Sequence, residues 1–331
     1  MNHPVLVLRR RWPAGAAWLL SVGLLVLLTT APALAQAPSS SAPPSLPASP
    51  RRVISMSPPI TEAVFAIGAG ERLVGRTDFC QYPPEATRVV SCGGYINPSF
   101  EALLTLAPDL VLIQGEHPAV REFCDSRGIP VMSLKLEGIE GVLNDLLALG
   151  VALDSHASAE ALVTGMRADL DALRMDRPEG SSAMPRPRVF ISLMRPAGPI
   201  DALYSTGRAS FVSELVVMAG GRNIFDDLTE AYPRISKEAL IERQPEVILE
   251  ILPGGVGADA RPAQAWVNDW RPLATLGAVQ RGDVRVVNEP AVIVPGPRLP
   301  TALRAIRAAL HPELASLDEA LPVVPQPQRH D

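Results

Sequence analysis

The side chains best suited to holding a ligand are aromatic, and they are few. Tyrosine and phenylalanine rings can stack on a flat ligand, and a phenol can also ligate ferric iron. Aromatic residues make up only 5% of the chain. Tyr95, in the loop-like text GGYIN, is a candidate of this kind, although it could equally be a lid over the core. The other aromatic candidates are Phe79, Tyr82, Tyr204 and Tyr232.

Three arginines stand in similar loop-like text. Arg195, Arg234 and Arg298 could pair with carboxylates or a phosphate on a ligand, because a guanidinium binds such groups through two parallel hydrogen bonds. Each could instead be a solvated surface charge or a salt-bridge partner.

Metal and enzyme chemistry have little support in the sequence. The chain has five histidines, far apart, and His117 alone follows a predicted strand, so a site for bare zinc or manganese is not expected. Nucleophile elbows, P-loops and dinucleotide fingerprints are missing, and Pro58-Pro59 occupies the turn where a nucleotide site would need glycines. A hydrolase or transferase remains the alternative of another class, since acidic pairs are common in such chains.

Short apolar runs alternate with helical patterns along the chain. Such runs, without polar alternation, are typical of strands buried on both faces of a parallel sheet, and they predict an α/β fold. The predicted strands cover residues 52–55, 73–75, 110–113, 130–134, 188–192 and 283–287. Ligands of such folds bind beyond the carboxyl ends of the strands. This rule gives the predicted ligand-binding set of Pro58, Pro59, Phe79, Tyr82, Tyr95, Glu116, Arg195, Tyr204, Tyr232, Arg234 and Arg298.

One stretch of the sequence occurs twice. SFEALLTLAPDLVLI and SKEALIERQPEVILEI align from Ser99 and from Ser236, and Glu101 and Glu238 keep the same place. The surrounding strands and helices repeat in the same order, which predicts two similar lobes. Between them, residues 155–174 carry leucines and Met166 at helical spacing without proline, which predicts one long connecting helix and small relative motion of the lobes. Trp266 and Trp270 are predicted to pack on the core.

The sequences of the two ends of the chain are not typical of folded structure. Arg9–Arg11, an apolar run and Ala33-Leu34-Ala35 predict a signal peptide over 1–35 rather than a membrane anchor. A Pro/Ser-rich disordered tether is predicted over 36–50 and a loose tail over 316–331. Cleavage removes three arginines and no acids, so the net charge falls from -5 to -8. An acidic exported protein is not expected to bind nucleic acid.

Three cysteines remain in an oxidising compartment. Cys80 and Cys92 are close in sequence and both lie in loop-like text, so they are predicted to form a disulfide. Cys124 lies in a helical pattern and is predicted to be a buried small hydrophobic residue.

The order and spacing of several fragments resemble a known family. RVISMSPPITEAVFAIGAGERLVG, TDFCQYPPEA, GGYINPSFEALLTLAPDLVLI, STGRASFVSELVVMAGGRNIF and the late VPGPR are similar to periplasmic substrate-binding proteins of ABC importers for cobalamin and iron complexes. The resemblance covers about residues 51–314. It implies a class III periplasmic binding protein, with Rossmann-like lobes at 51–154 and 179–315 joined by a rigid helix at 155–178.

The resemblance also implies functions for particular residues. A large chelate would bind between the lobes, and Glu101 and Glu238 would meet arginines of a membrane permease dimer. The alternative is that both acids only stabilise their helices, because a negative charge in the first turn interacts favourably with the helix dipole, with Ser99 and Ser236 as N-caps. TDFCQYPPEA and GGYINPSFEA look closest to the cobalamin branch, so a corrinoid is the expected ligand. A ferric siderophore and haem are the alternatives. No enzyme activity, bound cofactor or resident metal is expected.

Overall fold

The fold of the chain is known from a computed structural model. It describes residues 49–175, 186–201, 203–252 and 261–314. The predicted signal peptide, nearly all of the tether and the predicted tail lie outside these ranges. In the part of the chain that is described, no helix is both long and apolar enough to span a bilayer.

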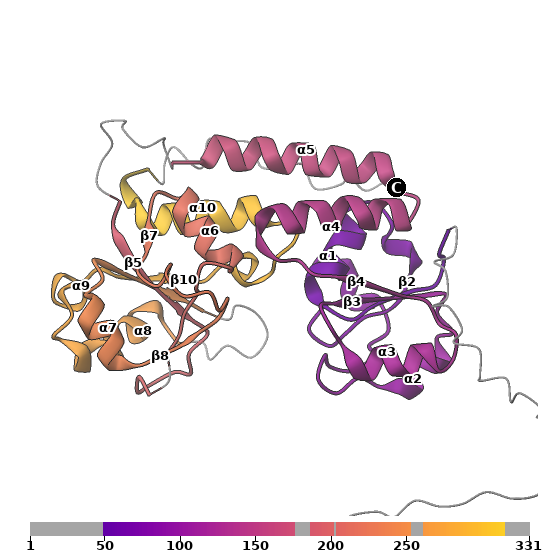
Figure 1. The fold of residues 1–331 in the computed structure, drawn as a ribbon, viewed down its shortest axis with the longest axis horizontal. Coiled ribbons are helices and arrows are strands. Elements are labelled where there is room, and N and C mark those ends of the chain that lie inside the picture. Colours follow the sequence, from indigo (N-terminus) through magenta and orange to yellow (C-terminus); the bar gives the residue numbers. More distant parts are fainter. Residues whose placement is uncertain (1–48, 176–185, 202, 253–260, 315–331) are drawn as a thin grey trace, which may run out of the picture. The chain divides into compact units, whose positions relative to one another are not determined.

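The first half of the described chain is built on a parallel four-stranded sheet of order β2-β1-β3-β4 (Figure 1). Its strands are β1 (Val53–Ser55), β2 (Leu73–Gly75), β3 (Leu110–Gln114) and β4 (Val131–Leu134). The helices around it are α1 (Pro58–Ala66), α2 (Phe100–Thr105), α3 (Pro118–Asp125) and α4 (Gly138–Ala152). The four predicted strands of this half are confirmed, because each apolar run pairs with its neighbours in parallel.

The second half repeats this arrangement. Its parallel sheet has the order β10-β9-β5-β7, with β5 (Arg188–Leu193), β7 (Arg222–Asn223), β9 (Val247–Ile251) and β10 (Val284–Val287). Read from β7, the second sheet has its strands in the order second, first, third and fourth along the chain. The first sheet, read from β2, has the same order. The predicted duplication therefore extends to the topology. The helices are α6 (Phe211–Met218), α7 (Lys237–Arg243), α8 (Ala263–Asn268), α9 (Gly277–Arg281) and α10 (Leu299–Leu310).

Smaller elements complete the structure. An antiparallel ribbon of β6 (Leu203–Tyr204) and β8 (Arg234–Ile235) was not predicted, since two-residue strands leave no periodic pattern. Short 3-10 turns cover Gly70–Arg72, Pro84–Arg88, Arg271–Leu273, Pro290–Ile293 and Pro312–Leu314.

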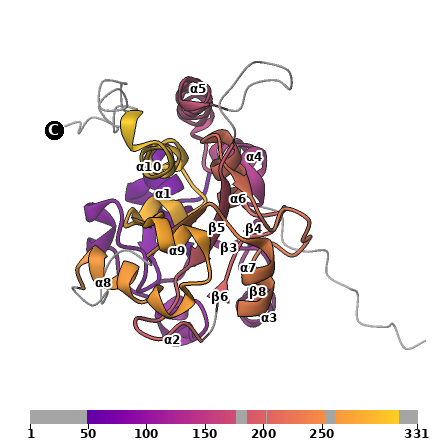
Figure 2. The same cartoon turned by 90° about the vertical axis from the view of Figure 1, so that its left-hand side faces the viewer.

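The predicted connecting helix is present as α5 (His156–Leu173). Its buried face carries Val163, Met166 and Leu170, at spacings of three and four residues. Figures 1 and 2 both place α5 beside α10, and Figure 1 shows it running along α4. Helices α4 and α5 approach closely at Gly150, where an added Cβ would lie 2.3 Å from the Cβ of Ala159.

One continuous hydrophobic core serves both sheets. It contains inward-facing residues of β1, β3, β5 and β9 together with the buried faces of α1, α4, α5, α6 and α10. Two smaller clusters cover the opposite faces, one under α2 and α3 and one containing Trp270. The halves are thus joined by shared packing as well as by α5, which limits independent movement of the two sheets.

Candidate ligand-binding site

Loops at the carboxyl ends of the strands carry most of the predicted ligand residues. Phe79 and Tyr82 follow β2, Glu116 follows β3, and the β6–β8 ribbon with its flanks carries Tyr204 and Tyr232. Parallel strands end at one edge of their sheet, so each half gathers its candidates on one edge. We call these two sets of loops the rims.

The rims expose large apolar side chains that a soluble protein would otherwise bury. Phe79 is 68% exposed, Tyr204 47% and Tyr232 48%. Ile96, 94% exposed in the loop before α2, and Met194, 52% exposed in the loop after β5, were not in the predicted set. Exposed apolar groups gathered in this way mark binding surfaces. Ile96 directly follows Tyr95, so proximity to a predicted residue was the only signal that could have found it.

Tyr95 is bonded to the end of β3 and to the loop that follows it. Its hydroxyl donates to the carbonyl of Gln114 at 3.0 Å, and its ring lies 4.5 Å from that of His117. His117 accepts at Nδ1 from the Val120 amide, capping α3, so its Nε2 carries the proton and donates to the Tyr95 carbonyl at 2.7 Å. Burial raises the pKa of the Tyr95 phenol. The phenol is therefore neutral and already hydrogen-bonded, and ligation of iron would require breaking that bond.

Arg195 is held inside the protein, and its predicted contact with a ligand stays a prediction. Its side chain is buried, with Nε donating to Glu250 at 3.0 Å and Nη1 to Asp269 at 3.1 Å. The alternative of a salt-bridge partner applies. The predicted packing of Trp266 and Trp270 is confirmed, since both are buried and the Trp270 indole donates to Glu250 at 2.7 Å. Burial raises the pKa of the Glu250 carboxyl, although Arg195 opposes this.

Asp269 holds the loop after β5 in place through hydrogen bonds. Its carboxylate accepts from Arg261 at 2.9 and 3.0 Å, from the Gly198 amide at 3.0 Å and from Arg195. The hydrogen bonds from Arg261, then from Gly198 and Arg195, lower its pKa to about 2. This loop begins with Met194, whose φ of 42° lies in the left-handed region. Left-handed backbone is costly for a residue with a Cβ, and the bonds around Asp269 help to hold it.

Arg298 is also committed to the protein. Its Nε and Nη2 bind both carboxylate oxygens of Glu62 at 2.8 and 2.6 Å, and Nη1 lies 3.5 Å from Glu289. Its guanidinium lies 4.2 Å from the ring centre of Tyr82. The predicted ligand contact of Arg298 stays a prediction, and Tyr82 is half-buried against its guanidinium.

The two prolines at the start of α1 pack rather than project. Pro59 is buried, and a Cβ added to Gly296 would lie 3.5 Å from it. Pro58 is half-buried, and the predicted ligand contacts of both prolines stay predictions.

Two predicted polar residues stay available at the rims. Arg234 and Glu116 are both exposed. Arg234 pairs with Tyr204 across the β6–β8 ribbon, so the two side chains share one face of it. Their predicted contact with a ligand stays a prediction.

The repeated acids lie in equivalent and exposed positions. Glu101 is in the first turn of α2 and Glu238 in the first turn of α7. The N-cap prediction is confirmed, because Ser99 accepts from the Ala102 amide at 3.2 Å and Ser236 makes the matching bond at 3.1 Å. Both helices lead into the third strand of their sheet, so both acids lie on the rim side.

The predicted disulfide between Cys80 and Cys92 is not formed. Both are free, buried thiols. Cys80 accepts from the Thr61 hydroxyl at 3.0 Å, whereas Cys92 packs against Gly75, where an added Cβ would lie 2.6 Å from its Sγ. Burial raises the pKa of the Cys92 thiol to about 11. The predicted burial of Cys124 in the core is confirmed.

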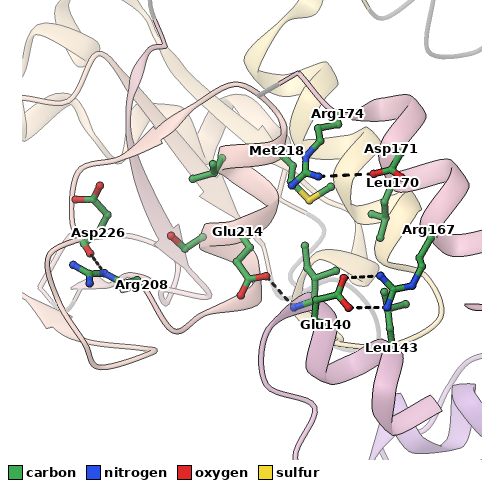
Figure 3. Close-up of a pocket in the computed structure, with 13 residues that line it drawn as sticks. Glu140, Leu143, Arg167, Leu170, Asp171, Arg174, Arg208, Glu214, Met218 and Asp226 are labelled. Carbon is green, nitrogen blue, oxygen red and sulfur yellow. Dashed lines mark hydrogen bonds and ion pairs between the residues drawn. The ribbon is translucent and has the colours of Figure 1, made fainter. Parts of the chain in front are cut away.

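A pocket of about 360 Å³ opens between α4, α5 and α6 (Figure 3). Figure 3 shows the Arg167–Glu140 pair, with both bonds at 2.7 Å, and Glu214 reaching the start of α4. None of the predicted ligand residues lines it, and its wall mixes acids and arginines. The pocket is therefore separate from the rims.

Comparison with known proteins gives consistent similarities. A family profile described as periplasmic binding protein matches residues 53–288. The chain is 29% identical over 264 residues to the vitamin B12-binding protein of Pectobacterium atrosepticum, covering 79% of this chain and 88% of that protein. It is 26% identical over 270 residues to the uncharacterized ABC transporter substrate-binding lipoprotein YvrC of Bacillus subtilis, covering 80% and 81%.

Solved structures show the same fold. A periplasmic heme binding protein from Pseudomonas aeruginosa superposes with a TM-score of 0.66 at 27% identity, covering 80% of this chain and 93% of that one. The periplasmic vitamin B12 binding protein BtuF of Vibrio cholerae gives 0.64 at 23% identity, covering 82% and 99%. The predicted fold, two α/β lobes of the class III periplasmic binding type, is confirmed.

Proposed function

The chain belongs to the periplasmic binding protein family, and from this premise we propose that it captures a corrinoid between its rims and delivers it to an ABC permease. The family and the relatives compared above are binding proteins, so the proposed function is binding without chemical change of the ligand.

The observation that carries the proposal is the exposed apolar surface of both rims. Phe79 and Ile96 from the first half, and Met194, Tyr204 and Tyr232 from the second, are costly to leave in water and fit the broad apolar faces of a large chelate. Arg234, exposed beside Tyr204, suits the phosphate of a complete cobalamin. The vitamin B12-binding relative supports the same ligand.

The two alternative ligands have less support. Three cationic side chains at the site would favour a ferric siderophore, but Arg195 and Arg298 are held in ion pairs and Arg234 alone of the three is exposed. Haem would need an axial ligand, and the hydroxyl of Tyr95 already donates to a carbonyl. The Pseudomonas aeruginosa relative is a heme binding protein, which raises haem above a ferric siderophore as the second candidate.

The proposed partner is a permease with two-fold symmetry. Glu101 and Glu238 are exposed, occupy the same turn of equivalent helices and lie on the rim side of each sheet. Two matched carboxylates can meet two matched arginines, and such contacts mainly set orientation and encounter rate. The ABC transporter relative of Bacillus subtilis supports a partner of this type.

Titration calorimetry tests the ligand. Pure protein is titrated with cyanocobalamin, cobinamide, ferric catecholate, ferric hydroxamate and haemin under one set of conditions. We expect one corrinoid to bind per chain, with tighter binding of cyanocobalamin than of cobinamide, and an unchanged absorption spectrum of the released ligand. Tighter binding of haemin or a ferric chelate, or chemical conversion of the ligand, would overturn the proposal.

A further inference from the structure

The two halves are joined by a buried ion pair between residues far apart in the chain. Glu62 belongs to α1 of the first half, and Arg298 is the N-cap residue of α10 in the second. Both carboxylate oxygens are bound, at 2.8 and 2.6 Å, and the side chains are 3% and 16% exposed. Two parallel hydrogen bonds between planar groups allow a narrow range of orientations, unlike contacts between apolar side chains.

The guanidinium also reaches the first rim. Its face lies 4.2 Å from the ring centre of Tyr82, in the loop that carries Phe79. On its other side Nη1 lies 3.5 Å from Glu289, which caps the 3-10 turn before α10. One side chain of the second half thus contacts the helix after β1 and the loop after β2 of the first half.

A second contact runs in the opposite direction. Glu214 of α6 accepts from the Ile139 amide at 3.0 Å and so caps α4, whose own N-cap residue makes no side-chain bond (Figure 3). Gly138, with φ of 64°, makes room for it, because an added Cβ would lie 2.7 Å from Glu214 Oε1. Each half therefore sends one carboxylate to the other.

We propose that Glu62 and Arg298 are a positioning pair, which sets the separation of the two rims and thereby how long the ligand stays bound. The inference rests on the proposed function, because the rims are taken as the ligand surface. The shared core resists separation of the halves, but apolar packing tolerates small shifts. The ion pair selects one arrangement among them, and the Tyr82 contact transmits it to the loop of Phe79. Burial of an ion pair usually contributes little net stability, so a role in specifying geometry explains its presence better.

The decisive variant replaces both charges by apolar groups of similar size, Glu62→Leu with Arg298→Met. Such replacements often leave stability unchanged or raise it, so folding and positioning can be separated. The matched control is Asp227→Asn, which weakens a two-bond pair with Arg243 inside the second half, at 2.6 and 2.8 Å. Arg298→Lys, which keeps the charge but loses the planar fork, is the second variant in case the double variant does not fold.

Two measurements report positioning. The first is the dissociation rate of cyanocobalamin. The second is the distribution of distances between spin labels at Thr105→Cys and Glu242→Cys, exposed positions on α2 and α7. The native cysteines are buried, so we expect the labels to attach at the two introduced thiols. We expect the double variant to release cyanocobalamin about tenfold faster or more, with a broader distance distribution. Asp227→Asn should match the unsubstituted protein within about twofold on both measures.

Unchanged dissociation together with an unchanged distance distribution, in the double variant or in Arg298→Lys, would overturn the positioning role. If the unsubstituted protein binds none of the chelates named above, the proposed function fails instead. The distance measurement would still decide the positioning role, because it needs no ligand.

Discussion

Replacement of Phe79 by alanine tests the rim as a binding surface. The ring is 68% exposed, so a ligand that covers it removes most of its surface from water. An aromatic side chain presents about 200 Å², which leaves roughly 130 Å² to be covered, worth about 3 kcal/mol at about 25 cal/mol per Å². Coverage is incomplete and binding orders the ring, so we expect a loss of about 1–3 kcal/mol, or about 5- to 150-fold in Kd.

The assay is calorimetric titration with cyanocobalamin, run beside urea unfolding of the free protein. An exposed ring adds little to folding, so the free energy of unfolding should change by less than about 0.5 kcal/mol. Val151→Ala is the matched control, since Val151 is 63% exposed on α4 and lies outside the rims. It should leave both quantities unchanged.

The reasoning would be refuted if Phe79→Ala bound cyanocobalamin as tightly as the unsubstituted protein. The same substitution at Tyr204, 47% exposed on the other rim, extends the test to the second half. Unchanged binding in both variants would mean that the exposed apolar surface serves another purpose.

Three further predictions concern docking, Tyr95 and pH. Reversing the charges of Glu101 and Glu238 together should abolish permease-dependent uptake into vesicles with ligand affinity unchanged, and a large loss of affinity would contradict the docking role. Tyr95→Phe should lower the free energy of unfolding by about 1 kcal/mol without weakening ligand binding, because it removes only the hydrogen bond to the Gln114 carbonyl at the end of β3 and keeps the ring. Tyr95→Ala should weaken binding by about 1–3 kcal/mol if the ring stacks on the ligand. The hydrogen bonds from Arg261 hold the pKa of Asp269 at about 2, below its ordinary 3.8, so the folded state binds this proton less readily than the unfolded state. The resulting stability, about 2 kcal/mol, is present above about pH 5 and is lost as pH falls through 3.8 towards 2. The free energy of unfolding in urea is measured across this pH range, and Asp269→Asn should remove this part of its pH dependence. An unchanged pH profile in the variant would contradict the assignment.

The sequence predicted the strands well because both sheets are parallel and buried. Continuous apolar runs such as LVLI leave little ambiguity when each is followed by a helical pattern. The connecting helix was equally clear, since its apolar spacing is regular and proline is absent. The common strand order of the two sheets followed from the repeated text. The β6–β8 ribbon left no such signal.

The pairing of the site arginines could not be predicted from the sequence, for one physical reason. Arg195 and Arg298 stand in loops just as Arg234 does, and nothing local distinguishes a guanidinium facing water from one facing a buried carboxylate. Glu62 lies 236 residues from Arg298, so their pairing depends on how the halves meet. Exposed rings are easier to place, because the edge of a parallel sheet fixes where its loops gather.

The core that both sheets share has a consequence for the duplicated design. A chain carrying a single copy of the repeat would leave the apolar sides of its strands and helices open to water along the surface that the other copy now covers. Such a fragment is expected to self-associate or aggregate rather than persist as a monomer. Carrying both copies in one chain therefore keeps the apolar surface of each copy permanently covered.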